Sequence, residues 1–184
     1  VRVVAGSPGM TGAAALAARA AQRTGAGMVA LSSPGLDGAT PTEAVGRRVA
    51  AFDWADDVLA DLHRFDALRI GPGLGRHDRT VPSVARSVAD AVVPTVVDGD
   101  GLFALSWNEQ GTPAFLVDRG VPTVLTPHDG EYALLTGAPP GADRVAAVRR
   151  LVELSGCVVL LKGPTTIVGD ASGRIRFIAD GDER

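Results

Sequence analysis

The chain has 184 residues, of which 46% are apolar and 21% charged, and its 18 Lys and Arg residues against 21 Asp and Glu residues give a net charge of −3. This length suits one compact domain with its own core. The basic residues form no stripe, which argues against nucleic-acid binding, and no apolar run reaches the roughly 18 residues of a membrane helix. Because the sequence has one cysteine, Cys157, and no leader-like start, we expect a cytoplasmic protein in which this thiol is a small buried apolar group.

The first half of the chain alternates apolar runs with amphipathic stretches. Thr11 and Asp53 are the expected N-caps of two helices, and Gly25 is the expected end of the first. The Gly- and Pro-rich stretch 32–43 is predicted to be a loop. In chain order, the patterns predict a strand over 1–4, a helix over 11–24, a strand over 27–33, a helix over 53–65 and a strand over 66–75.

The second half continues this alternation and then changes in style. Two β-branched runs around a Gly/Asp/Ser turn predict a hairpin over 165–179. The whole pattern is typical of an α/β domain with a largely parallel central sheet flanked by helices, followed by a C-terminal β-hairpin. Before the hairpin, the patterns predict a helix over 80–91, a strand over 94–101, a short helix over 102–106, a strand over 122–131, a helix over 142–155 and a strand over 157–163.

Glycines and polar residues gather after the predicted strands. Ligands of open α/β sheets bind outside the carboxyl ends of the strands, so these segments are expected to lie along one edge. The segments are "GSPGMTG" (6–12), "GPGLGR" (71–76), "DGDG" (98–101), "TPHDGE" (126–131) and "KGPTT" (162–166).

The glycine segments allow two interpretations each. The glycines of 6–12 permit a tight turn and close helix packing, or a ligand wall, and their spacing is neither that of a phosphate loop nor that of a dinucleotide fingerprint. The glycines of 71–76 bring bare backbone close to a flat or charged ligand, or only adopt positive φ. Asp98 and Asp100 could hold Mg²⁺ through water or orient ligand hydroxyls, or they form a turn and cap a helix.

The last two segments carry His128 and Lys162. His128 and Glu131 are either ordinary helix-start residues, with Thr126 near the cap, or ligand contacts. Lys162 ends an apolar strand, where its ammonium can meet phosphate charge or extend to solvent.

The order and spacing of these motifs resemble one family closely. "GSPGMTGAAALAARAAQRTGAG", "IGPGLGR", "VVDGDGL", "LTPHDGE" and "VVLLKGPTTIV" are similar to segments of the ADP- or ATP-dependent NAD(P)H-hydrate dehydratases, which have the ribokinase-like fold. The resemblance covers essentially the whole chain and implies a single, partial dehydratase domain over 1–184.

The resemblance implies an enzyme that repairs hydrated NADH or NADPH (NADHX or NADPHX). With ADP or ATP and Mg²⁺ as cofactors, such enzymes phosphorylate the hydroxyl of the hydrated ring, and loss of phosphate restores the dinucleotide. Its partners would be this substrate and the nucleotide, with no nucleic acid and no membrane. It would be a homo-oligomer, a tetramer by family, with an epimerase domain possible as a fusion or as a partner.

The resemblance also implies roles for single residues. No protein ligand of a metal is implied. Asp129 stands where the family commonly has proline, which adds negative charge near an anionic ligand. The expected substrate contacts are Gly9, Met10, Thr11, Gly12, Gly73, Gly75, the aspartate pair Asp98 and Asp100, and Thr126, Pro127, His128, Asp129, Gly130 and Glu131. The expected contacts to the nucleotide phosphates are Lys162, Gly163, Pro164, Thr165 and Thr166.

The family continues into a glycine-rich "GTGD" segment that opens a helix, and this segment is not found in the sequence. Its amides would cradle phosphate and its aspartate would be the general base, so no catalytic residue is assigned here. Together with the missing helix before the first strand, this predicts a chain truncated at both ends and inactive alone. The alternatives are a ribokinase-like kinase of vitamin precursors and a non-catalytic nucleotide-binding remnant.

Overall fold

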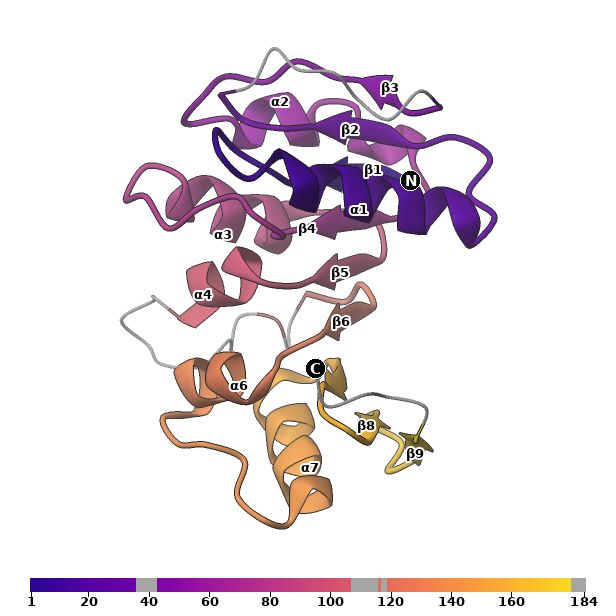
Figure 1. Cartoon of the computed structure of the whole chain (residues 1–184), viewed down its shortest axis with the longest axis vertical. Coiled ribbons are helices and arrows are strands. Elements are labelled where there is room, and N and C mark those ends of the chain that lie inside the picture. Colours follow the sequence, from indigo (N-terminus) through magenta and orange to yellow (C-terminus); the bar gives the residue numbers. More distant parts are fainter. Residues whose placement is uncertain (36–42, 107–115, 117–118, 180–184) are drawn as a thin grey trace.

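A computed structural model describes residues 1–35, 43–106, 116 and 119–179. Its strands form one sheet in the order β3-β2-β1-β4-β5-β6-β7-β8-β9 (Figure 1). Pairing is parallel from β3 to β7 and antiparallel from β7 to β9. The strands are β1 (Arg2–Val4), β2 (Ala30–Ser32), β3 (Val45–Gly46), β4 (Leu68–Ile70), β5 (Thr95–Val97), β6 (Thr123–Leu125), β7 (Val158–Leu161), β8 (Thr166–Gly169) and β9 (Ile175–Ile178).

Among the described residues, helices follow β1, β3, β4, β5 and β6. This arrangement confirms the predicted α/β class with a largely parallel sheet and a C-terminal hairpin. The helices are α1 (Thr11–Arg23), α2 (Ala55–Leu59), the 3-10 turn η1 (Leu62–Arg64), α3 (Val81–Asp90), α4 (Asp100–Ser106), α6 (Asp129–Thr136) and α7 (Arg144–Ser155).

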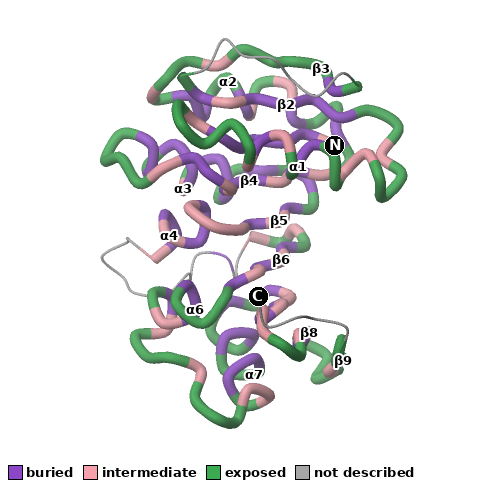
Figure 2. Tube along the Cα trace, in the orientation of Figure 1, coloured by how far each residue is buried: buried purple, intermediate pink, exposed green. Residues whose placement is uncertain are grey.

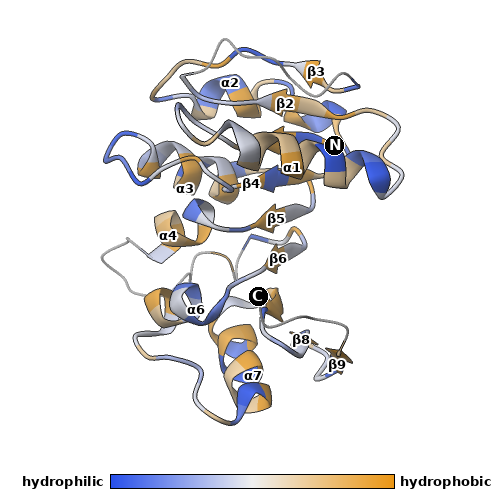
Figure 3. Cartoon of the chain, in the orientation of Figure 1, coloured by the Kyte–Doolittle hydropathy of each residue, from blue (hydrophilic) through white to orange (hydrophobic). Residues whose placement is uncertain are grey.

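The core has two parts, one on each face of the sheet. Successive strand residues point to opposite faces, so Val4 lies in the large cluster that includes side chains of α2, α3, α4, α6 and α7, while Val3 lies in a smaller cluster with the alanines of α1. Figure 2 shows the inner strands buried, whereas the edge strands β3 and β9 are exposed. In α7, buried Val148 and Leu151 alternate with exposed Arg149 and Arg150, which gives the helix the two-sided colouring of Figure 3.

The parallel register brings the five expected segments to one edge. Ile70 pairs with Val4 on one side and with Val97 on the other, and Leu125 pairs with Val97 and with Val159. The carboxyl ends of β1, β4, β5, β6 and β7 are therefore neighbours, and the prediction of a shared edge is confirmed.

Two predicted helix caps are wrong. Helix α1 begins at Thr11 itself, because the turn closed by Met10 N–H on Ser7 O places Met10 in the cap position, and no side chain caps it. Helix α2 begins at Ala55, after Trp54. Trp54 is fully buried and its backbone N–H donates to Ser83 Oγ, so tertiary packing fixes the start of α2. Asp53 instead has a φ of 55° and pairs with Arg79.

Other boundaries differ in length. The segment 122–131, predicted as one strand, ends as a strand at Leu125 and then begins α6, because His128 caps that helix. The helix predicted over 53–65 divides into α2 and η1. The short strand β3 was not predicted, since two exposed residues carry no periodic pattern. Most of the predicted loop 32–43 lies outside the described residues.

Several predictions hold closely. The helices predicted over 80–91 and 142–155 are α3 and α7, and Gly25 follows the end of α1 with a φ of 97°. Cys157 is 3% exposed, as expected of a small buried residue. Within the part of the chain that is described, no helix is long and apolar enough to cross a membrane.

Candidate active site

Lys162 lies at the shared edge immediately after β7, the last of the five parallel strands that form this edge. Its Nζ lies 2.8 Å from Asp98 Oδ1 and 3.5 Å from Glu131 Oε2. Asp98 follows β5 and Glu131 lies in the first turn of α6, so three separate segments meet at one ammonium group. The Lys162 side chain keeps 39% of its surface exposed, whereas Glu131 keeps 6%. The lysine therefore remains reachable by an anion from solvent.

The Asp98 carboxylate is held in its ionised form. Burial acts to raise its pKa, but the hydrogen bond and positive charge of Lys162, the hydroxyl of Thr126 and the charge of Arg69 together lower it below the ordinary value. Arg69 NH2 lies 3.2 Å from Asp98 Oδ2. Sequence reasoning missed Arg69. The sequence feature that could have indicated its role is that Arg69 is a single charged residue inside the apolar strand β4.

Asp100 has different partners from Asp98. Its Oδ2 accepts a hydrogen bond from the Gly75 amide at 2.9 Å, and its Oδ1 from Arg76 Nε at 3.0 Å. The Arg76 guanidinium also lies over the Phe103 ring, 4.6 Å from its centroid. The two aspartates of the expected pair therefore bond to different residues. Among the described residues there is no group of three or more His, Cys, Asp or Glu that could hold a metal ion.

The glycines of 71–76 have specific packing reasons. A Cβ on Gly71, whose φ is 127°, would lie 1.9 Å from the Asp98 carbonyl oxygen. A Cβ on Gly73 would lie 2.8 Å from Ala13 Cβ, and the Gly73 carbonyl accepts a hydrogen bond from Ser7 Oγ. Gly71 and Gly73 are therefore required by close contacts with the Asp98 backbone and with helix α1, whereas Gly75 has a φ of 79° and no close neighbour.

The segment 6–12 forms the outer part of the same edge. Gly9 and Gly12 have open space where a Cβ would be, and Met10 is 51% exposed. Thr11 is also exposed. Hence this segment packs through Ser7 and presents Gly9–Gly12 to solvent.

His128 has a structural task as well as an exposed ring. Its Nδ1 accepts hydrogen bonds from the amides of Gly130 and Glu131 at 3.0 and 3.2 Å, while Glu131 Oε2 accepts from His128 N–H at 2.9 Å. This reciprocal capping box confirms the helix-start interpretation. Because Nδ1 is an acceptor, the proton of the neutral ring lies on Nε2. The ring is 58% exposed, and its Nε2 lies 3.4 Å from Glu131 Oε1, so a ligand oxygen would share or replace that contact.

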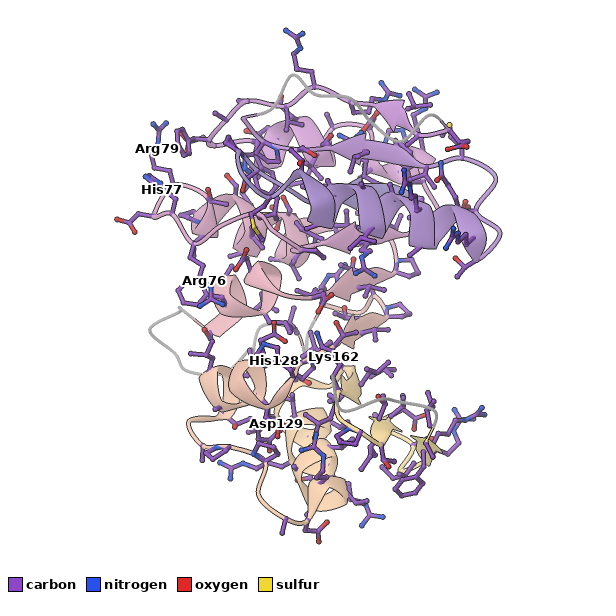
Figure 4. All side chains as sticks on the ribbon, in the orientation of Figure 1. Arg76, His77, Arg79, His128, Asp129 and Lys162 are labelled. Carbon is purple, nitrogen blue, oxygen red and sulfur yellow. The ribbon has the colours of Figure 1, made fainter. Side chains whose placement is uncertain are left out.

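The loop after β7 joins this segment through its backbone. Lys162 N–H donates to Pro127 O at 2.8 Å, and the Lys162 carbonyl accepts from Arg144 NH2 at 2.7 Å. Pro164 and Thr165 are exposed, and Thr166 begins β8. Figure 4 shows His128 and Lys162 close together with Asp129 below them, while Arg76, His77 and Arg79 lie to the left, beyond the ends of the strands.

The chain is similar to known proteins over nearly its whole length. The family model described as NAD(P)H-hydrate dehydratase matches residues 1–183. A bifunctional NAD(P)H-hydrate repair enzyme of Mycobacterium tuberculosis is 38% identical over 173 residues, which is 94% of this chain and 34% of that protein. The chain thus spans about a third of the length of that curated relative.

Two solved structures are similar over nearly the whole chain. The ADP/ATP-dependent NAD(P)H-hydrate dehydratase of Bacillus subtilis, co-crystallised with ATP/Mg²⁺ and soaked with CoA, is 25% identical with a TM-score of 0.76, covering 98% of this chain and 65% of that one. A ribokinase-like protein of Enterococcus faecalis shares the fold, with 21% identity, a TM-score of 0.79 and coverage of 98% and 63%. On the match of its whole length, this chain belongs to the NAD(P)H-hydrate dehydratase family.

Proposed function

We propose that the protein converts hydrated NADH or NADPH back to NADH or NADPH with ADP or ATP and Mg²⁺. The terminal P–O–P linkage of the nucleotide breaks as its phosphoryl group passes to the ring hydroxyl, whose proton goes to solvent. Phosphate then leaves with the electrons of the C–O bond, and the neighbouring ring carbon loses a proton to solvent as the ring C=C bond forms. The observation that carries this proposal is the half-exposed Lys162 ammonium, set between Asp98 and the His128 segment at the carboxyl edge of a sheet of this family.

The nucleotide phosphates bind at the loop after β7 in this proposal. Lys162 supplies a point charge for them, and the exposed Pro164 and Thr165 leave room beside it. Asp98 keeps the ammonium oriented when no anion is bound. The contact set is Lys162, Gly163, Pro164, Thr165 and Thr166.

The hydrated dinucleotide binds along the neighbouring segments. His128 offers Nε2–H to an oxygen of the substrate, and the open backbone around Gly9 and Gly12 forms a wall for it. None of these residues is proposed to take the proton of the acceptor hydroxyl, because Asp98 is bonded to Lys162 and Asp100 to the Gly75 amide. The contact set is Gly9, Met10, Thr11, Gly12, Gly73, Gly75, Asp98, Asp100 and Thr126 to Glu131.

Mg²⁺ would enter with the nucleotide. The ion usually keeps several waters and binds through one or two carboxylates plus substrate phosphates. Asp98 and Asp100 are the carboxylates of this edge that could contact the ion through water, provided that Mg²⁺ displaces part of their pairing with Arg69, Lys162 and Arg76. The described residues form no dedicated cage of three or more His, Cys, Asp or Glu. When bound, Mg²⁺ would neutralise charge on the transferring phosphoryl group.

Further features are proposed from the family alone. A cytoplasmic location, a homo-oligomer such as a tetramer, a single dehydratase domain over 1–184 and an epimerase domain, fused or separate, would accompany this activity. The curated relatives are bifunctional by name, and the chain matches about a third of their length.

The test is to incubate the purified protein with NADHX or NADPHX, ATP or ADP, and Mg²⁺, and to follow NADH absorbance and phosphate release. We expect both signals from a chain that also carries the GTGD segment of the family and neither signal from these 184 residues alone, and omission of the nucleotide should abolish both signals. Ready turnover by the 184 residues alone would contradict their expected inactivity. A phosphorylated product that persists without NADH formation would favour a kinase. Calorimetric binding of nucleotide and NADPHX without turnover by either chain would favour a non-catalytic remnant, and either of these last two results would overturn the proposal.

A further inference from the structure

Arg144 joins three segments of the candidate site. It is the first residue of α7, and its guanidinium forms a bidentate pair with Asp129, at 2.9 Å from Oδ1 and 3.0 Å from Oδ2. The same guanidinium donates to the Lys162 carbonyl at 2.7 Å. Its side chain is 24% exposed, so these contacts are partly shielded from water.

Gly163 has no side chain, which leaves room for the Arg144 guanidinium. A Cβ at this position would lie 2.9 Å from Arg144 NH2 and 3.4 Å from Cζ, so the guanidinium rests directly on the glycine backbone. Gly163 has no positive φ to explain it. The glycine is therefore explained by the arginine, in addition to any phosphate contact.

The backbone of Lys162 is consequently held from both sides. Its N–H bonds to Pro127 O in the His128 segment, and its carbonyl bonds to Arg144, while Arg144 returns to the same segment through Asp129. This closed set of contacts fixes where β7 ends and where the loop 162–166 leaves the sheet. The negative charge of Asp129 is neutralised by Arg144 and does not face an incoming anion alone.

Resting on the proposed function, we infer that Arg144, paired with Asp129, is a positioning residue that sets the loop 162–166 for nucleotide binding. In this inference Arg144 acts without contacting either ligand, because its two terminal nitrogens bond to Asp129 and to the Lys162 carbonyl, and its Nε is buried without a partner. Arg144 acts by fixing the position of the Lys162 backbone. A bidentate arginine contact cannot be copied by lysine, which has a point charge.

The first measurement is nucleotide affinity. We compare the protein with Arg144→Met, Arg144→Lys and Asp129→Asn, and use Arg150→Met, an exposed arginine of the same helix, as the matched control. Calorimetry with ATP and Mg²⁺ should give a dissociation constant about 10-fold higher for Arg144→Met and about 3-fold higher for Asp129→Asn, because a charged hydrogen bond is lost or weakened. Arg144→Lys should recover only part of the affinity, and Arg150→Met should match the unchanged protein.

The second measurement needs no ligand and separates this inference from the proposed function. Hydrogen exchange of the peptide that covers 162–166 should be faster in Arg144→Met and Asp129→Asn than in Arg150→Met. Equal exchange, or an Arg144→Met protein that binds ATP normally while its melting temperature falls, would overturn the positioning role. If the unchanged protein binds no ATP, the proposed function fails, and hydrogen exchange still decides whether Arg144 positions the loop. Asp129→Asn serves for both measurements if Arg144→Met does not fold.

Discussion

The Lys162 ammonium donates a hydrogen bond of 2.8 Å to the Asp98 carboxylate, although the two residues are 64 positions apart in the chain. Their strands β5 and β7 are both neighbours of β6, so the contact spans the end of one strand. This hydrogen bond keeps the lysine side chain directed along the edge before a ligand arrives. An anion that binds Lys162 must then compete with Asp98 or share the ammonium group with it.

Lys162 is the sole lysine of this sequence, which makes its amine directly testable. We expect an amine-selective acylating reagent to modify Lys162, apart from any N-terminal amine, and ATP with Mg²⁺ to slow that reaction because phosphate oxygens cover the ammonium. Lys162→Met should raise the dissociation constant for ATP by about 10-fold or more, since it removes a charged contact. Peptide mass spectrometry after timed labelling checks the first result, and equal labelling with and without ATP would contradict it.

Acid should weaken the protein partly through Asp98. Its pKa is lower in the folded protein than the ordinary value of 3.8, because Lys162, Thr126 and Arg69 outweigh the opposing effect of burial. The ionised carboxylate therefore stabilises the fold above about the ordinary pKa, and this contribution is lost as pH falls through the lower folded pKa. Between pH 5 and pH 2, urea midpoints should fall more steeply for the unchanged protein than for Asp98→Asn, and parallel curves would contradict the role of Asp98.

The two tasks of His128 can be separated by substitution. Asparagine can accept the Gly130 and Glu131 amides as an N-cap but offers no imidazole Nε2–H. We expect His128→Ala to lose about 1 kcal/mol of unfolding free energy, as an uncapped helix does, and His128→Asn to lose much less. Both should bind NADPHX more weakly.

Chemical denaturation and calorimetry on the same two variants check this pair of effects. If His128→Asn binds NADPHX as tightly as the unchanged protein, the imidazole serves only as a cap. If His128→Ala keeps its full stability, the capping box contributes nothing measurable.

Gly71 should be among the least replaceable residues of the edge. Its φ of 127° is strained for any other residue, and a Cβ would lie 1.9 Å from the backbone oxygen of Asp98. We expect Gly71→Ala to cost about 2 kcal/mol or more of unfolding free energy, because backbone has to move. Gly27→Ala is the matched control, since Gly27 has no positive φ and open space for a Cβ. Equal urea midpoints for the two variants would contradict this reason for Gly71.

The sequence predicted those parts of the fold that depend on hydrophobic periodicity. The alternation of strands and helices located the shared edge, because parallel strands place all their carboxyl ends together. It could not predict that Asp98 and Asp100 have different partners, since Arg69 and Arg76 reach them only through the folded chain. Asp53 failed as a cap for a similar reason: the burial of Trp54 decides where α2 begins.

The family resemblance added roles that the residues alone left open. The spacing of 6–12 excluded a phosphate loop without assigning another task, and the structure adds a contact of Ser7 with Gly73. Arg144 was overlooked because a lone arginine at a helix start has no motif. Only the folded chain places it on Gly163.

Cys157 provides a chemical probe for the opposite edge of the sheet, just before β7. Its thiol is 3% exposed, and burial raises its pKa, although the hydrogen bond with Ser155 and the charge of Arg119 partly oppose this. The nucleophile is the thiolate, so both low accessibility and a raised pKa should slow its reactions. We expect an aromatic disulfide reagent at pH 8 to react with Cys157 at the rate of unfolding, and within seconds once denaturant unfolds the chain. Fast stoichiometric labelling of the native protein would contradict the burial of this residue. ATP should not speed up the labelling of Cys157 in the native protein, because nucleotide binding at the far edge stabilises the folded state.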